Sequence, residues 1–230
     1  TPALGPWKEF IERREHATET VNIGLVGKYD LQDAYKSIRE SLSHAGTYND
    51  YKVNISFINS EGITEDNVAD KLSGQDGIMI CPGFGQRGIE GKIIAAHYTR
   101  THDIPTFGIC LGMQLMTEFS TEGNVATLGL MQGQTDLIPD NGLPLPHMGW
   151  NKVRYTPDHP LFAGIEQDSH FYFVHSYAVQ PNENTIATSC YGADFSAAIA
   201  NKNFYGVQFH PERSGKNGAL LLRNFVENVK

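Results

Sequence analysis

The stretch Phe107-Gly108-Ile109-Cys110-Leu111-Gly112-Met113-Gln114 places one cysteine between two glycines, directly after a short apolar run. The run predicts a buried strand and the residues after the cysteine predict a helix, so that Cys110 lies at the tip of a tight turn. The glycines have no Cβ atoms that would clash in such a turn. The positive end of the helix dipole favours the thiolate form of a cysteine there. The stretch therefore predicts a nucleophile, and the alternative is an ordinary buried cysteine in a core strand.

Strands and helices alternate along the chain that leads to this turn. We expect strands at 21–27, 52–59, 76–81 and 104–109, with helices at 33–45, 64–72 and 89–100 between them. The alternation predicts an α/β fold, a three-layer, doubly wound and mostly parallel sheet flanked by helices. After residue 119 the pattern changes to extra antiparallel strands, followed by a last helix at 218–229. These shorter strands are expected at 128–133, 151–155, 171–179, 186–191, 197–200 and 205–209.

Length and charge limit the classes of protein to consider. The 230 residues, 40% hydrophobic and 19% charged, suit a charged helical or linker segment over 1–20 and one domain over 21–230. Because the chain begins at Thr1 rather than Met, we expect it to be processed or cut from a longer protein. The formal net charge of -8 disfavours nucleic-acid binding through a general basic surface. No apolar run approaches the roughly 20 residues that span a bilayer, so we expect no membrane association.

The three cysteines, Cys81, Cys110 and Cys190, are far apart in the sequence. Their spacing fits neither a disulfide scaffold nor a zinc site, so we expect no metal and a reducing, cytoplasmic environment. We also expect no cofactor. We interpret Cys81 and Cys190 as buried, structural residues.

A cysteine nucleophile usually has a histidine beside it and an acid that fixes the histidine tautomer. Of the nine histidines, His147, His175 and His210 have the most suitable contexts. His210 ends a predicted strand, and Glu212 follows it after a proline that fixes the backbone. Glu212 is therefore expected to accept the second N–H of the His210 ring, at the edge of the sheet where Cys110 also lies.

A second loop, Pro82-Gly83-Phe84-Gly85, leaves the strand expected beside that of Cys110. A glycine-rich loop in this position can turn backbone N–H groups toward an anion. Together with the N–H of Leu111 it would form an oxyanion hole, and an ordinary turn is the alternative.

Gly108-Ile-Cys110-Leu-Gly-Met-Gln114 together with Gln208-Phe-His210-Pro-Glu212 resembles the class I, or triad, glutamine amidotransferases. The resemblance implies hydrolysis of the L-glutamine side-chain amide through a glutamyl thioester, with ammonia passed to a synthase. Cys110 would attack the amide carbon, His210 would move the protons and Glu212 would orient His210. The backbone of Gly83 and Leu111 would supply the oxyanion hole. The residues implied to hold the substrate are Gln114, Glu122 and the backbone of His175, Ser176 and Tyr177; for Glu122 a plain surface acid is the alternative.

The two halves of the chain resemble different members of this family. Residues up to about 114 are similar to the glutaminase domain of CTP synthase, of pyrimidine biosynthesis, through 23–29, 33–37 and 82–92. Residues from about 115 are similar to the glutaminase subunit of imidazole glycerol phosphate synthase, of histidine biosynthesis, through 143–151, 171–177 and 209–215. The change falls in the motif that both share, near 108–115, which suggests a chimera.

The resemblance also implies synthase partners. Met148, Trp150 and Arg213 would face a cyclase subunit, and they are residue types favoured at interfaces, although a core tryptophan is the alternative for Trp150. The resemblance to CTP synthase links the loop 84–92 to a nucleotide effector. Other interpretations are a partnerless binding or scaffold domain with a poorly active triad, and another cysteine hydrolase such as a γ-glutamyl hydrolase or a peptidase.

Overall fold

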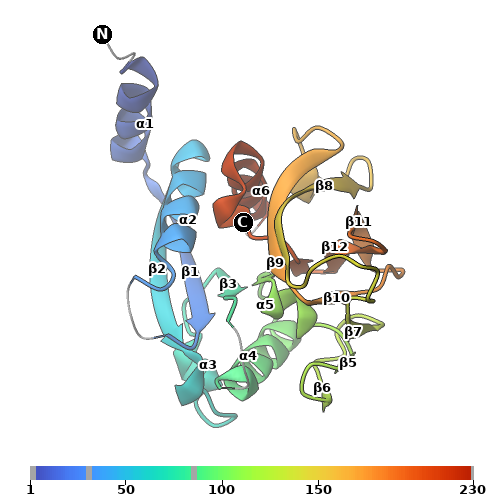
Figure 1. The fold of residues 1–230 in the computed structure, drawn as a ribbon. Coiled ribbons are helices and arrows are strands. Elements are labelled where there is room, and N and C mark those ends of the chain that lie inside the picture. The colour runs from blue at the N-terminus through green and yellow to red at the C-terminus, as the bar shows by residue number, and fades with distance from the viewer. Residues whose placement is uncertain (1–3, 30–32, 84–86, 229–230) are drawn as a thin grey trace.

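Five parallel strands form one side of the main sheet in the computed structural model, which describes residues 4–29, 33–83 and 87–228 (Figure 1). In spatial order they are β2 (Tyr51–Asn59), β1 (Glu19–Gly27), β3 (Gly77–Ile80), β4 (Thr106–Ile109) and β13 (Phe204–Val207). The first four come from the first half of the chain, and β13 comes from near its end. The parallel pairing of β4 with β13 therefore joins the two halves within one sheet.

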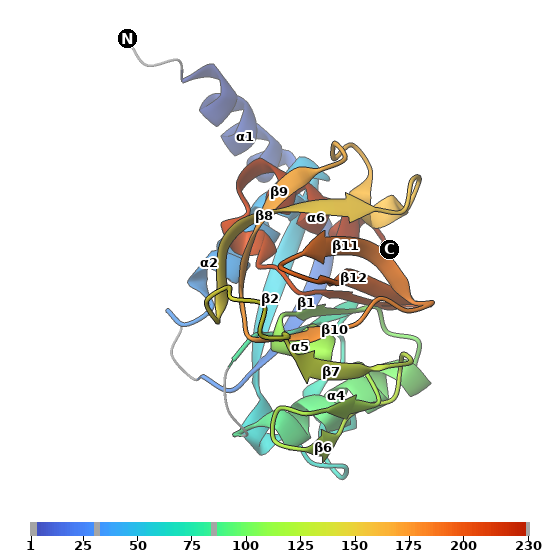
Figure 2. The same ribbon diagram turned by 45° about the vertical axis from the view of Figure 1, so that its right-hand side comes forward.

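Antiparallel strands extend this sheet beyond β13, as the sequence predicts. They are β12 (Asp194–Asn201), β11 (Thr185–Cys190), β8 (His147–Tyr155) and β9 (Ser169–His175). Within the described residues the sheet has nine strands. A smaller sheet lies beside it (Figure 2) and consists of β10 (Tyr177–Val179), β7 (Gln134–Leu137), β5 (Phe119–Ser120) and β6 (Val125–Ala126).

Helices cover both faces of the parallel strands. The odd-numbered side chains of β1, such as Leu25, join a buried cluster with α2 (Lys36–Tyr48) and α6 (Gly215–Asn228). Val26, on the opposite face, joins a cluster with α3 (Val68–Lys71) and α4 (Ile89–Thr101). Because successive side chains of a strand point to opposite faces, a fully apolar strand needs a helix layer on each side. The three-layer, doubly wound α/β architecture is therefore confirmed.

Helix α1 (Gly5–His16) extends away from the sheet in both ribbon views (Figures 1 and 2). None of its residues is buried, and Trp7 is 60% exposed. Its Arg13 contacts Asp50 with an Nε–Oδ1 distance of 3.1 Å. The division into a segment 1–20 and a domain 21–230 stays a prediction. Among the described residues, no helix is long and apolar enough to cross a membrane.

Several local predictions are wrong. The strand predicted at 128–133 is absent from the structure, because Gly129 (φ 57°) and Gly133 (φ 100°) turn the backbone out of the extended region. The strand predicted at 171–179 divides at Ser176 into β9 and β10, which belong to different sheets. Cys190 is exposed rather than buried.

The helix predicted at 64–72 is only one turn long, α3. The sequence predicts a longer helix, because Thr64 is a favourable residue type for a helix start. Instead the side chain of Asn67 accepts the Thr64 N–H (2.9 Å) and donates to the Gly62 carbonyl (3.0 Å). These bonds hold residues 62–67 as a turn, so the helix begins later.

Candidate active site

Cys110 lies in the turn between β4 and the short helix α5 (Leu111–Gln114). Its backbone has φ 52° and ψ -108°, a conformation that non-glycine residues rarely adopt. A Cβ atom on Gly108 would lie 2.4 Å from the carbonyl carbon of Gly112, and one on Gly112 would lie 2.4 Å from the Ile80 oxygen. The turn thus has the predicted form, and the two glycines are needed because backbone passes directly beside them.

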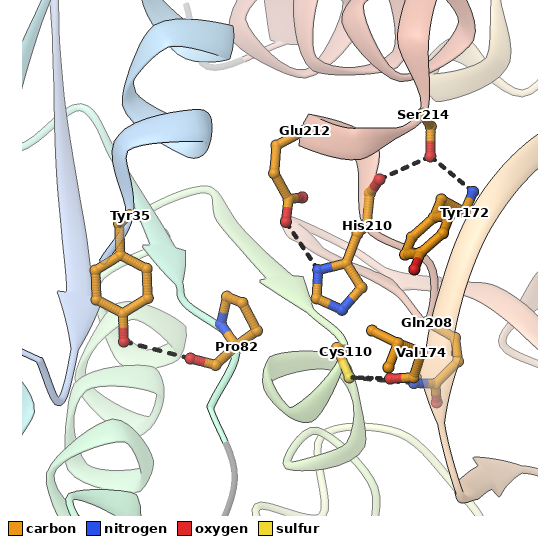
Figure 3. A network of polar contacts seen from close by, with 9 residues as sticks. All are labelled: Tyr35, Pro82, Cys110, Tyr172, Val174, Gln208, His210, Glu212 and Ser214. Carbon is orange, nitrogen blue, oxygen red and sulfur yellow. Dashed lines mark hydrogen bonds and ion pairs between the residues drawn. The ribbon is translucent and has the colours of Figure 1, made fainter. Parts of the chain in front are cut away.

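The sulfur of Cys110 is buried between strands of the second half. Its thiol donates to the Val174 carbonyl at 3.9 Å, and Gln208 Nε2 donates to the sulfur at 3.6 Å (Figure 3). The Cys110 backbone N–H donates to the Val207 carbonyl at 2.8 Å. Residues on β9 and β13 therefore fix the surroundings of a cysteine that the first half of the chain presents.

His210 follows β13, and Glu212 lies in the short 3-10 helix η3 (Pro211–Arg213). The His210 Nδ1 and Glu212 Oε1 atoms are 2.8 Å apart, and both side chains are at least nine-tenths buried. The Ser214 hydroxyl donates to the His210 carbonyl at 2.7 Å and accepts the Tyr172 N–H at 3.0 Å (Figure 3). The predicted His–Glu hydrogen bond is therefore present, and the turn that carries it is tied to β9.

The charge state of His210 follows from its neighbours. Burial by itself lowers the pKa of a histidine, but interactions with Cys110 and Glu212 outweigh it and raise the pKa of His210 to about 10. The raised pKa makes the ring a strong acceptor for the Cys110 proton. Its Nε2 atom is buried and, among the residues described, makes no hydrogen bond of normal geometry.

One cavity of about 110 Å³ brings the predicted site residues together. Cys110 and His210 both line it, and Glu212 lies behind His210. Ten residues form its wall: Pro82, Gly83, Cys110, Leu111, Gln114, Glu122, His175, Ser176, Tyr177 and His210. Each residue that the sequence assigned to the oxyanion hole or to substrate binding thus lies at this cavity.

Two polar side chains shape the far end of the cavity. Gln114 is buried, and its Nε2 donates to the Tyr177 carbonyl and to Gln208 Oε1, both at 3.0 Å. Glu122 is half-buried, and burial raises the pKa of its carboxyl group. A partly desolvated carboxylate at a cavity wall is suited to a cationic group. Gln208 was missed as a site residue, although it belongs to the motif that carries His210.

A buried histidine pair behind the cavity was also missed. His147 Nδ1 and His175 Nε2 are 3.0 Å apart, and His175 Nδ1 is 2.8 Å from the Tyr177 carbonyl. Burial lowers the pKa of His147 to about 4 and that of His175 to about 3. In neutral rings His175 donates to Tyr177, so His147 must donate to His175. The pair thus supports the backbone that lines the cavity. The sequence feature that could have revealed it is the presence of one histidine on each of two strands that pair with each other.

The predicted partner residues lie outside the cavity. Met148 (63% exposed) and Trp150 (56% exposed) are on β8, and Arg213 is exposed in η3. The core interpretation of Trp150 is wrong, since more than half of the residue is exposed; its ring lies edge-on to Tyr172, with centroids 6.0 Å apart. Of the predicted effector loop 84–92, residues 84–86, and with them Phe84 and Gly85, lie outside the described residues. Within the described ranges, no three acidic, histidine or cysteine side chains group as metal ligands would.

Comparison with curated proteins separates the two halves. The second half is 82% identical over 125 residues to imidazole glycerol phosphate synthase subunit HisH of Mannheimia succiniciproducens, covering 54% of this chain and 64% of HisH. The first half is 71% identical over 117 residues to CTP synthase of Bacteroides thetaiotaomicron, covering 50% of this chain and 22% of that protein. The chain thus spans less than two thirds of the length of these relatives. The two matched stretches together exceed the chain, so they overlap.

The solved structures agree on the fold. The glutaminase domain of Trypanosoma brucei CTPS, with bound acivicin, superposes with a TM-score of 0.71 at 24% identity and covers 91% of this chain and 93% of that one. The family described as glutamine amidotransferase class-I matches residues 30–229. That match covers most of the chain, including both halves and the turn between them. The chain belongs to the class-I glutamine amidotransferase family.

Proposed function

We propose that this chain hydrolyses the side-chain amide of L-glutamine and supplies the ammonia to a synthase. The observation that carries the proposal is the single cavity in which Cys110, in its strained turn, meets His210 and its hydrogen-bonded Glu212. A nucleophile, a base and an orienting acid in this order are the elements of a cysteine triad. Membership of the amidotransferase family supports glutamine as the substrate.

The first half-reaction forms a thioester. The Cys110 thiolate attacks the amide carbon and forms a C–S bond, while the N–H groups of Gly83 and Leu111 hold the oxygen that becomes negative. His210 then gives its Nε2 proton to the nitrogen, the C–N bond breaks and ammonia leaves. In the structure the Cys110 thiol donates to Val174, so to form the thiolate it must first turn toward Nε2 and give its proton to the His210 ring. Catalytic hydrogen bonds are often loose before substrate binds, which fits this arrangement.

The second half-reaction releases glutamate. Neutral His210 takes a proton from water, and the oxygen attacks the thioester carbon. The C–S bond breaks, and the thiolate again faces an imidazolium. Glu212 keeps the ring in the tautomer that presents Nε2, because its Oε1 holds Nδ1–H at 2.8 Å.

Gln114 and Glu122 suit the amino-acid end of the substrate. Glu122 offers a half-buried carboxylate to the α-ammonium group, and Gln114 is held in place by two hydrogen bonds. The backbone of His175, Ser176 and Tyr177 completes the wall. The cavity therefore recognises one end of the substrate through charge and the amide through the triad.

We assign the synthase-facing surface to Met148, Trp150 and Arg213. The two exposed apolar side chains on β8 resemble the anchors of protein interfaces, and Arg213 directly follows Glu212. The match of the second half to a synthase subunit supports a cyclase as the partner. The match of the first half to CTP synthase supports the synthase domain of that enzyme as the alternative partner. We interpret the chain as a chimera that joins at the shared turn.

Glutamate release from glutamine tests the proposal, measured with the chain alone and with each candidate synthase. Cys110→Ala is expected to abolish release, whereas Cys190→Ala removes an exposed thiol and leaves release unchanged. Equal release by Cys110→Ala and by the unmodified chain contradicts the enzyme assignment and leaves the scaffold interpretation.

Covalent labelling separates glutaminase from other cysteine hydrolases. A glutamine-like electrophile is expected to label Cys110 in the Cys190→Ala chain, with protection by free glutamine. Protection by peptides instead would favour a peptidase or γ-glutamyl hydrolase.

A further inference from the structure

Two side chains hold successive carbonyl groups of the loop that leads to Gly83. Lys92 Nζ donates to the Cys81 carbonyl at 2.7 Å. The Tyr35 hydroxyl donates to the Pro82 carbonyl at 3.3 Å. Cys81-Pro82-Gly83 is therefore fixed at two adjacent peptide groups, immediately before Gly83 reaches the cavity.

Lys92 is an unusual residue to find in this position. Its side chain is 1% exposed and is among the largest that are fully buried. Helix α4 brings it there by passing very close to the chain before it, since a Cβ on Gly91 would lie 1.7 Å from the Ser60 carbonyl oxygen. Burial lowers the pKa of Lys92 to about 8, so the ammonium form persists at neutral pH. A buried charge is costly unless it makes hydrogen bonds, which argues for a role beyond packing.

Tyr35 reaches Pro82 through a space left by a glycine. A Cβ on Gly27 would lie 2.6 Å from Cε2 of the Tyr35 ring, so a larger residue at 27 would displace it. The ring stacks on Phe57, with centroids 5.9 Å apart. Burial raises the pKa of the hydroxyl well above its usual value, so it remains a hydrogen-bond donor.

The position of these donors decides where the Gly83 N–H points. In a trans peptide the carbonyl and the following N–H point in opposite directions. Within the described chain the sole cis bond is Leu145–Pro146, so Pro82–Gly83 is trans. In Figure 3 Tyr35 and Cys110 lie on opposite sides of Pro82, and the Pro82 carbonyl is turned toward Tyr35. The Gly83 N–H is therefore turned to the Cys110 side.

We propose that Tyr35 and Lys92 are positioning residues that clamp Cys81-Pro82-Gly83 with the Gly83 N–H turned to the cavity, so that the oxyanion hole is formed before any synthase binds. This inference rests on the proposed glutaminase function. Both residues belong to the half that is similar to CTP synthase, so the clamp does not depend on the second half. A donor to the oxyanion acts mainly in the transition state, so the clamp contributes to kcat rather than to substrate binding.

The test compares Tyr35→Phe, Lys92→Met and the double variant in glutamate release. Each single variant removes one hydrogen bond and keeps most of the side-chain volume. We expect kcat to fall about tenfold in each, with KM for glutamine unchanged, since loss of a whole oxyanion donor lowers kcat by about 10²–10³. In the double variant the fold-loss of kcat should be smaller than the product of the two single fold-losses, because both residues restrain the same segment. Tyr48→Phe and Lys71→Met, which alter exposed residues, are the matched controls.

A second readout does not need turnover. A glutamine analogue with an aldehyde in place of the amide adds to the Cys110 thiol and places its oxygen in the oxyanion hole. Its dissociation constant should rise about tenfold in each variant, in parallel with the loss of kcat. Binding of glutamine itself, measured in the Cys110→Ala background, should be unchanged.

The outcomes separate the two proposals. If the aldehyde fails to add to Cys110 in the unmodified chain, the glutaminase function itself is contradicted. If it adds with equal affinity to the unmodified chain and both variants, and kcat is equal, the clamp is overturned while the function stands. A change in KM alone, or the same loss in Tyr48→Phe and Lys71→Met, also overturns the clamp.

Discussion

The two halves of the molecule differ in architecture and in what they bring to the site. The first half is a parallel sheet with helices on both faces, and it presents Cys110, Leu111 and the Gly83 loop. The second half is mostly antiparallel, and it presents His210 with Glu212 and much of the cavity wall. Neither half holds a complete triad. Two families can therefore be joined only where both place the same strand end against the same partner strand.

The contact between the halves resembles the interior of one protein. β4 and β13 pair in parallel with Gly108 opposite Gly206, and the rings of Phe107 and Phe225 lie 4.8 Å apart. At the end of α2, Asn49 exchanges two hydrogen bonds of 2.9 Å with Arg223 on α6. The structure thus predicts that stability and activity both depend on groups that face each other across this contact.

The largest expected effect is that of removing the base while leaving the nucleophile. His210→Gln should lower kcat for glutamate release at least about 100-fold, because Cys110 loses both its proton acceptor and its imidazolium partner. The control is His97→Gln, an exposed histidine of α4 in the first half. Retention of more than about a tenth of the activity would break the idea of a site shared between the halves.

The joining turn should tolerate no added methyl group. Gly112→Ala should lower the free energy of unfolding by about 3 kcal/mol, because the new Cβ would lie 2.4 Å from a backbone oxygen of β3. Gly62→Ala, where no atom lies within 4 Å of the new Cβ, is the matched control. Denaturant titration followed by circular dichroism measures the free energy of unfolding of both variants. Similar losses in Gly112→Ala and Gly62→Ala would show that the turn is not tightly constrained.

The buried histidine pair should give the second half a characteristic acid sensitivity. The pKa of His147 is lowered to about 4, so between pH 6.5 and 4 the unfolded chain binds a proton there that the folded chain does not. Stability therefore falls as the pH drops through this range. Between pH 6.5 and 4.5 the unmodified chain should lose about 2 kcal/mol more than His147→Gln. If the free energy of unfolding of the unmodified chain and of His147→Gln fell in parallel with pH, His147 would not be held neutral. His97→Gln again serves as the control.

The smallest effect measures how well the halves fit. A double-mutant cycle of Phe107→Ala and Phe225→Ala should give a coupling of about 1 kcal/mol across the contact. The reference is Phe171 with Phe209, a pair within the second half whose rings are 4.2 Å apart. Equal couplings would mean that the join packs as well as a native core. A coupling near zero for Phe107 with Phe225 alone would reveal a mismatch.

Much of the fold and of the site could be predicted from the sequence, because interactions between residues close in the sequence determine them. The apolar runs of β1, β3 and β4, the glycines around Cys110 and the proline between His210 and Glu212 each constrain their own neighbourhood. What could not be predicted depends on distant partners. Cys190 is exposed because its strand presents alternate residues to solvent, and Lys92 is buried because Gly91 lets α4 approach Ser60. The break at Ser176 likewise arises because β9 and β10 pair with strands of different sheets.

The exposure of both tryptophans has a practical consequence for spectroscopy. Trp7 on α1 and Trp150 on β8 are the two tryptophans of the chain, one in each half, and both are more than half exposed. Their emission reports the local environment of two separate surfaces rather than the state of the core. Replacing either with phenylalanine would leave a single tryptophan, whose emission can be excited selectively. On addition of the proposed synthase partner, a blue shift of Trp150 emission alone would indicate contact at β8, and a shift of Trp7 emission alone would indicate contact at α1.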